Sequence, residues 1–258
     1  MNVPYKEGIW KGESKRVLRC KKKKRPTKSA ALMIISLQKI SCYTLSMIIT
    51  YDGVESVRVS HGDFTIALNP ISKESKFKLP SFGSDLVLIT ANHPDFNGAD
   101  TATRQGKEPF VIKGPGEYEV RGVFVRGFES KTVYGGTEKF NTVYSFELDG
   151  IRIGFLGAIS DKDLSQKAKE EMGDIDIIFV PIGGDEVLGG EDSYKIANKR
   201  EPKIIIPIHF GSVGQKDALD KFLKEADAVG TKPVDKLTIK RKDLIGKEGE
   251  VVILTQSI

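Results

Sequence analysis

The chain has 258 residues, 39% hydrophobic and 29% charged, a composition that suits one large globular domain or two modest ones. Its two cysteines, Cys20 and Cys42, both precede Met47, which excludes a disulfide framework and a zinc site made of four cysteines. The net charge of +5 hides an asymmetry, because residues 1–28 carry 11 Lys and Arg against 2 acidic residues, whereas the remainder carries 29 against 33. The body is therefore mildly acidic, which argues against a nucleic-acid footprint across the whole domain. The cysteine usage favours a reducing, cytoplasmic location.

The amino-terminal region combines a basic cluster with a short apolar run. KKKKR precedes ALMII, an order typical of signal peptides, but Ser36 and Lys39 interrupt the apolar run. The run is much shorter than the ~20 apolar residues that a membrane-spanning helix needs, so no transmembrane span is expected. We predict a basic, disordered leader over residues 1–46 and a single folded domain over residues 47–258. The alternative is a basic arm, residues 15–28, that contacts nucleic acid or a membrane surface.

Short strand-like runs dominate the first half of the domain. Many are separated by a few residues that include Gly, Asn or Asp, which predicts antiparallel hairpins, as at LDG in residues 148–150. The predicted strands cover residues 48–51, 56–60, 64–68, 86–90, 109–112, 117–120, 123–128, 143–148 and 151–156.

After residue 160 the pattern alternates between helix and strand. DKDLSQKAKEEMGD predicts a helix with Asp161 or Asp163 at its amino-terminal cap and Gly173 at its end. Continuous apolar runs predict strands that are buried on both faces. Two sheets packed face to face, with helices outside, would satisfy both halves. The predicted strands of this half cover residues 175–184 and 202–211, and two further helices cover residues 191–200 and 215–230.

Three buried strands end in loops with polar or small residues: TANHPDFNG, FLGAISD and IPIHFG. The ends of neighbouring central strands converge at one edge of a sheet, where functional sites are commonly built. The loops therefore nominate His93, Asp95 and His209 as site residues.

Five blocks of sequence carry a resemblance to a known family. ITYDGVESVRVSHGDFTIALNP, LVLITANHPDFNG, YSFELDGIRIGFLGA, DIDIIFVPIGG and IIIPIHFG occur in that order within residues 47–255. Together they resemble the metallo-β-lactamase superfamily, in particular its branch of lactonase-like Zn-dependent hydrolases. The resemblance implies an α+β fold, a four-layer αββα sandwich with its site at one edge of the sheets.

The resemblance also implies where metal ligands would stand. The family loop T-H-x-H-x-D-H supplies most ligands of two zinc ions, and here its matching residues are His93 and Asp95, with His209 at the late histidine. The other positions depart from the pattern. Residues 128–133, where a mid-chain histidine is expected, contain none. Replaced positions are Ala91 and Phe96 at the first and last histidines of the loop, Ala158 at the bridging aspartate, and Val54 after Gly53 where the family has a Gly-His pair.

Catalytic zinc needs three protein ligands and an open position for water. One implied zinc position keeps only His93, and the other keeps Asp95 and His209. We therefore predict a degenerate site in a weakly active or non-catalytic protein that holds no metal cofactor and binds a small molecule or protein at the former active-site edge. The alternative is an active hydrolase with one zinc ion held by His93, Asp95 and His209, joined by Glu117 or Asn92, and with Asp95 as general base.

Each surviving residue also has a structural interpretation. His93 would hydrogen-bond its own loop, and Asp95 would cap backbone amides around residues 97–98. His209 would be either a ligand or a buried histidine paired with Asp95. Aromatic side chains are expected to fill the volume of the lost metal ions and water: Phe96, Phe155, Phe210 and Tyr118.

Overall fold

The computed structural model describes residues 45–257 except residues 105 and 107. Almost all of the predicted leader, with both cysteines, thus lies outside the described residues, and the first strand begins at Met47. The described part of the chain contains no helix long and apolar enough to cross a membrane.

Six strands form the first sheet, in the order β12-β1-β2-β3-β4-β5. Strands β1 to β3 form antiparallel hairpins, as their short turns predict, whereas β3, β4 and β5 run parallel. The strands are β1 (Met47–Gly53), β2 (Ser56–His61), β3 (Phe64–Leu68), β4 (Leu86–Leu88), β5 (Phe110–Ile112) and β12 (Leu237–Ile239).

Seven strands form the second sheet, in the order β13-β11-β10-β9-β8-β7-β6. Its β6 to β9 half is an antiparallel meander, and its β9, β10, β11 and β13 half is parallel. The strands are β6 (Gly116–Val120), β7 (Val123–Thr132), β8 (Lys139–Leu148), β9 (Ile151–Phe155), β10 (Ile177–Pro181), β11 (Ile204–Ile208) and β13 (Glu250–Val251).

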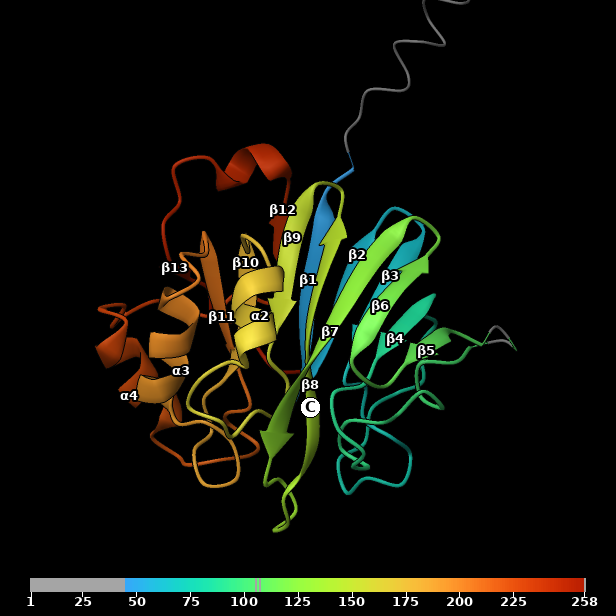
Figure 1. Cartoon of the computed structure of the whole chain (residues 1–258), viewed down its shortest axis with the longest axis horizontal. Helices are drawn as coiled ribbons and strands as arrows, with labels where there is room; N and C mark the ends of the chain where they lie inside the picture. Colours follow the sequence, from blue (N-terminus) through green and yellow to red (C-terminus); the bar gives the residue numbers. More distant parts are fainter. Residues whose placement is uncertain (1–44, 105, 107, 258) are drawn as a thin grey trace, which may run out of the picture. The chain divides into compact units, whose positions relative to one another are not determined.

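The helices alternate with the later strands of the second sheet in sequence, and α3 packs on β10 and on α4 (Figure 1). The first helix starts later than predicted, because Ser165, and not Asp161 or Asp163, provides the cap by accepting a hydrogen bond from the Ala168 amide. The helices of the described residues are α2 (Gln166–Glu171), α3 (Gly190–Asn198), α4 (Ala218–Glu225) and the 3₁₀ helix η2 (Arg241–Leu244).

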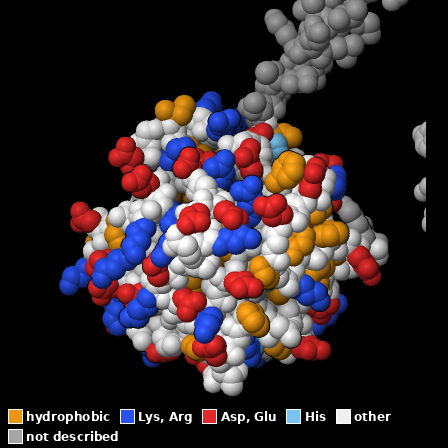
Figure 2. Space-filling view, viewed as in Figure 1, with side chains coloured by type: hydrophobic (Ala, Val, Ile, Leu, Met, Phe, Trp, Pro, Cys, Tyr) orange, Lys and Arg blue, Asp and Glu red, His pale blue; other side chains and the backbone are white. Residues whose placement is uncertain are grey.

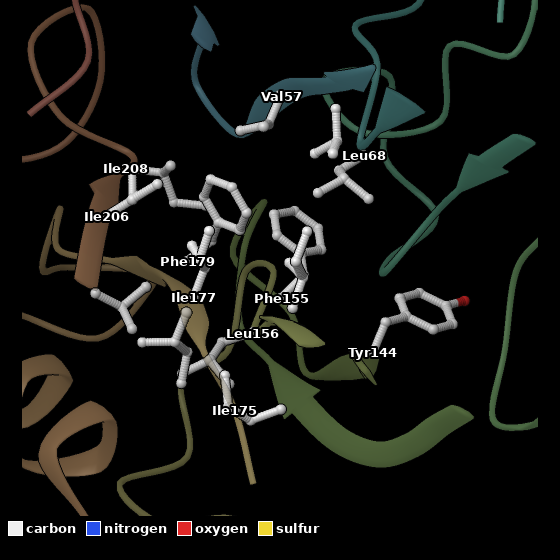
Figure 3. Close-up of a cluster of buried hydrophobic side chains, with 14 of the residues drawn as sticks. Val57, Leu68, Tyr144, Phe155, Leu156, Ile175, Ile177, Phe179, Ile206 and Ile208 are labelled. Carbon is white, nitrogen blue, oxygen red and sulfur yellow. The ribbon is translucent and has the colours of Figure 1, made fainter. Parts of the chain in front are cut away.

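The main core lies between the two sheets, where inward-facing apolar side chains of both sheets meet (Figure 3). Phe155 and Phe179 pack edge to face with ring centroids 6.1 Å apart, and both are fully buried. Burying such a side chain contributes roughly 1.5–3 kcal/mol, so this core dominates the stability of the domain. Phe155 therefore fills the core and not the predicted metal site, which corrects that expectation.

The outer face of the first sheet is covered by loops. In the described residues no helix lies between Leu68 and Phe110, and a second apolar cluster seals this face. Its members are Ala67, Phe82, Val87, Ile89 and Ala102. The face of the molecule seen in Figure 2 carries charges of both signs side by side, with apolar side chains gathered on the right of the view.

Candidate functional site at the sheet edge

Loops from both sheets meet at one edge, as the sequence predicts. The β1–β2 turn and the loop after β4 belong to the first sheet, and the loops after β9, β10 and β11 belong to the second. Two glycines allow the close approach. A Cβ on Gly157 would lie 2.4 Å from Thr90 Oγ1, and a Cβ on Gly183 would lie 2.5 Å from His209 Cδ2.

An apolar cluster fills the centre of this edge, and we call it the plug. Its side chains are at most 9% exposed, and side chains of Phe77, Leu79 and Val213 pack against it. Four positions at which the resemblance indicated replaced ligands contribute members to it, and residues 128–133 contribute none. The plug consists of Val54, Ile71, Ala91, Phe96, Tyr134, Ala158 and Val187.

Tyr134 lies between the two surviving histidines. Its ring meets His93 edge to face at 4.8 Å and His209 edge to face at 5.4 Å, and it packs on Phe96 at 4.6 Å. The sequence interpretation missed this residue, because KTVYGGTEKFNT looks like an exposed hairpin tip. A signal was present, since Tyr134 directly follows the segment in which the family pattern expects a histidine. Of the expected volume-filling aromatics, Phe96 does occupy the plug.

Asp95 is buried and accepts two hydroxyl hydrogen bonds, from Ser75 Oγ at 2.5 Å and from the Tyr134 hydroxyl at 2.8 Å. This corrects the expectation that its carboxylate caps amides around residues 97–98. Both partners are neutral donors, so the carboxylate is stabilised without a cation. Burial and the hydrogen bond to Asp95 both raise the pKa of Tyr134 above its ordinary value, so the phenol stays protonated as a donor.

His93 hydrogen-bonds its own loop, as predicted. Its Nδ1 accepts from the Asp95 backbone N–H at 3.2 Å, which assigns the proton to Nε2 in the neutral ring. The distance from Nδ1 to Asp95 Oδ2 is 3.6 Å, too long for a hydrogen bond. Burial lowers the pKa of His93, and the nearby Asp95 opposes this only in part, which agrees with a neutral imidazole.

His209 pairs with Glu55 and not with Asp95, which corrects the structural interpretation of this histidine. His209 Nδ1 and Glu55 Oε1 are 2.9 Å apart, and both side chains are almost completely buried. Burial raises the pKa of Glu55, whereas the contact with His209 lowers it. The Tyr134 ring packs on His209, and its hydroxyl binds Asp95, so the tyrosine stands between the two predicted partners.

The Glu55–His209 pair is the centre of a buried polar network. Asn69 Nδ2 donates to Glu55 Oε2 and to Thr90 Oγ1, both at 2.8 Å, and Asn69 Oδ1 accepts from the Thr90 amide. The backbone amide of His209 lies within hydrogen-bond distance of the Tyr51 hydroxyl and of the Val54 carbonyl. The network thus connects the first sheet, through β1, β3 and β4, with the end of β11 in the second.

The structure does not gather the predicted ligands into one set. No three His, Cys, Asp or Glu side chains of the described residues are placed to hold a metal ion. Glu117 lies on β6 against Arg126, and Asn92 accepts a hydrogen bond from Asn97. The assignment of His93, Asp95 and His209 as zinc ligands, and of Asp95 as a general base, stays a prediction.

Two packed sheets with a site at one shared edge are characteristic of one class of protein, the proteins with the metallo-β-lactamase fold. A family model, the Beta-lactamase superfamily domain, matches residues 48–209, and the chain belongs to that superfamily. A metal-dependent hydrolase of Lysinibacillus sphaericus is 25% identical over 197 residues, which cover 64% of this chain and 86% of the relative. Another of Staphylococcus carnosus is 36% identical over 150 residues, 50% of this chain and 62% of the relative.

Solved structures agree with the assignment. A Thermotoga maritima protein described as a Zn-dependent hydrolase of the metallo-β-lactamase superfamily superposes with a TM-score of 0.62 and 27% identity, covering 81% of this chain and 98% of that one. A metallo hydrolase from Ignicoccus hospitalis, at 17% identity and a TM-score of 0.56 over 82% of this chain and 96% of that one, shares the fold. The predicted fold class is therefore confirmed.

Proposed function

We propose that this chain is a non-catalytic, binding member of the metallo-β-lactamase superfamily, in which an apolar plug has replaced the catalytic metal centre. The plug is the single observation that carries the proposal. It joins four positions at which the family pattern places ligands with Tyr134 and two further apolar residues, Ile71 and Val187. A loss of ligands alone would leave a polar hole, whereas here the replaced positions are buried and contribute to one apolar cluster.

The residues present do not fit a zinc ion. Zinc takes nitrogen and oxygen ligands at about 2.0–2.2 Å, and a catalytic site needs three of them around one point. The Tyr134 ring separates the two histidines, and the lone pairs of Asp95 already accept hydrogen bonds from two hydroxyls. His209 uses Nδ1 for Glu55. An ion at His209 Nε2, the nitrogen that Glu55 does not contact, would have to displace the Tyr134 ring, and an ion at Asp95 would compete with the two hydroxyls.

The polar network takes over the structural connection that shared metal ligands would make between the two sheets. Glu55 and Asn69 belong to the first sheet and His209 to the second, and their contacts are direct. A buried pair of this kind holds its geometry better when its other atoms are satisfied. Asn69 satisfies Glu55 Oε2, and Thr90 in turn satisfies Asn69. The former site thus serves as a structural connection between the two sheets.

Metal analysis tests the proposal directly. The full chain is produced in zinc-supplemented medium, purified without metal-affinity resin, and measured by inductively coupled plasma mass spectrometry. The Lysinibacillus sphaericus relative, treated in parallel, is the positive control. We expect far less than one zinc ion per chain. The proposal fails if stoichiometric zinc is present and is lost in His209→Ala but retained in His61→Ala, whose histidine lies on β2 beside Asp149.

Hydrolysis gives an independent readout. The chain and its His209→Ala and Asp95→Ala variants are assayed with zinc against a nitrophenyl ester, a bis-nitrophenyl phosphate and a lactone. We expect equal, background rates for all three proteins. A rate in the unmodified chain that both substitutions abolish would support the alternative, an active hydrolase with a single-metal site of His93, Asp95 and His209.

The basic residues 15–28 lie outside the described residues, and their contact with nucleic acid stays a prediction. Binding to DNA or RNA that weakens steeply with salt and disappears on deletion of residues 1–46 would support it. Binding that persists after the deletion would assign it elsewhere.

A further inference from the structure

A cavity of about 780 Å³ lies beside the plug, on the other side of the loop that follows β4. That loop presents His93 and Asp95 to one side, whereas it presents Asn92 and Asn97 to this cavity. The volume is within the range of cavities that bind small molecules, roughly 300–1,000 Å³. His93, Asp95 and His209 are not among its lining residues, whereas Asn92, named above as a possible additional ligand, is.

The walls of the cavity are fixed by one buried side chain. The Tyr144 hydroxyl donates to the Ile89 carbonyl at 2.9 Å and accepts from the Gly114 amide at 2.9 Å. It thereby ties the segment after β5 to the segment after β4, which form two sides of the cavity. The Thr142 amide closes the third side by donating to the Thr90 carbonyl at 2.9 Å. A cavity held in this way is preorganised, so a ligand does not have to order it.

Charge in the cavity has one sign. Lys113 and Lys139 contribute to its lining, and no Asp or Glu is among its described lining residues. Glu138, the neighbour of Lys139 in sequence, pairs with Lys131 at 3.0 Å. Within the described residues neither cavity lysine makes an ion pair. Lys139 Nζ donates a hydrogen bond to the Tyr134 carbonyl, 3.3 Å away, and so leans toward the neighbouring loop.

The cavity also has an apolar part. Ile89, Ala91 and Val111 contribute to its lining, and the Phe140 side chain, 79% exposed, stands at its rim. An exposed phenylalanine next to a cavity gains free energy when a ligand covers it. Asn97 donates to Asn92 Oδ1 at 3.0 Å, which orients the Asn92 amide nitrogen as a further donor.

We propose that this cavity binds a small organic anion, a carboxylate or phosphate that carries an aromatic or branched alkyl group. The anionic group lies between Lys113 and Lys139, and the apolar group covers Ile89 and Val111 beneath Phe140. This inference rests on the proposed binding function and names its class of ligand. It does not rest on the state of the metal site.

Isothermal titration calorimetry of the full chain tests the inference with three probes: 2-naphthoate, 2-naphthyl phosphate and the neutral 2-naphthylmethanol. The three share one ring system and differ in charge. We expect 2-naphthoate to bind about tenfold more tightly than the alcohol, since two partly exposed lysines each contribute modestly. The phosphate should bind at least as tightly as the carboxylate.

Matched variants assign the effect to the cavity. Lys113→Gln/Lys139→Gln should remove the difference between anion and alcohol. Lys216→Gln/Lys236→Gln removes the same charge from exposed positions outside the cavity and should preserve it. Both double variants leave the basic residues 1–28 unchanged, so a difference between the two variants is not caused by those residues. Phe140→Ser should weaken all three probes by about fivefold, because it removes apolar cover and no charge.

The inference is overturned if the alcohol binds as well as the two anions, if both double variants lose the difference equally, or if no probe binds at millimolar concentration. Repeating the titration after treatment with EDTA keeps the two proposals apart. Bound zinc together with unchanged probe affinity would refute the proposed loss of catalysis and leave the anion cavity standing.

Discussion

The two sides of the sheet edge, one around Asp95 and one around His209, are stabilised in different ways. On one side, Asp95 accepts hydrogen bonds from two neutral hydroxyls beside a partly exposed, neutral His93. On the other, His209 is sealed in the interior against a carboxylate, Glu55, that is itself fully buried. The first arrangement tolerates change, because neutral donors can rotate or take up water. The second does not, because removing one member leaves a charge or a strong polar group without a partner in a dry interior.

The largest expected effect is therefore on the Glu55 side. Glu55→Ala removes the partner of His209 and of Asn69 at once, and we expect the free energy of unfolding to fall by about 3–5 kcal/mol. Urea denaturation followed by circular dichroism measures the change. Glu117→Ala, in which the carboxylate is 73% exposed and pairs with Arg126, is the matched control and should change stability by less than about 0.5 kcal/mol. Equal effects of the two substitutions would refute the structural role of the network.

The second effect concerns the plug, which separates the two sides. Tyr134→Ala removes a ring that contacts His93, Phe96 and His209, and we expect a loss of about 3 kcal/mol from the contacts and the cavity that remains. We also expect that this variant still binds no stoichiometric zinc, because Ala91, Phe96 and Ala158 supply no ligands. Tight zinc binding on removal of the ring alone would show that Tyr134 is only a lid over an intact metal site.

The same residues show how much of the fold and of the candidate site could be predicted from the sequence alone. The apolar runs of β10 and β11, the hairpins of β1 to β3 and the meeting of strand ends were all predictable, because they follow from local periodicity and turn chemistry. The replaced ligand positions could also be read from the resemblance. Their packing into one plug depends on contacts between segments far apart in the sequence, which no local pattern reports.

Glu55 and Tyr134 are the two residues that the sequence did not reveal, for the same physical reason. Glu55 lies in the turn of YDGVESV, where a carboxylate is normally solvated, and its partner His209 is 154 positions away. Tyr134 occupies a glycine-rich hairpin tip that folds back over the sheet edge. The cap of α2 was missed more locally, because Ser165 lies inside a run that also offers Asp161 and Asp163 as caps.

The smallest expected effect tests whether the Asp95–Tyr134 side of the edge is independent of the Glu55–His209 side. Tyr134→Phe keeps the ring in the plug and removes only the hydrogen bond to Asp95, so we expect a loss of about 1 kcal/mol. Asp95→Asn should cost a similar amount, because an amide offers one acceptor where the carboxylate offers two. In a double-mutant cycle the two changes should couple by roughly 0.5–1 kcal/mol, since each removes part of the same contact. The losses of unfolding free energy caused by Tyr134→Phe and Glu55→Gln should instead be additive, because no hydrogen bond of the described residues joins these two side chains. A strong coupling between the two substitutions would mean that both sides of the edge form one unit.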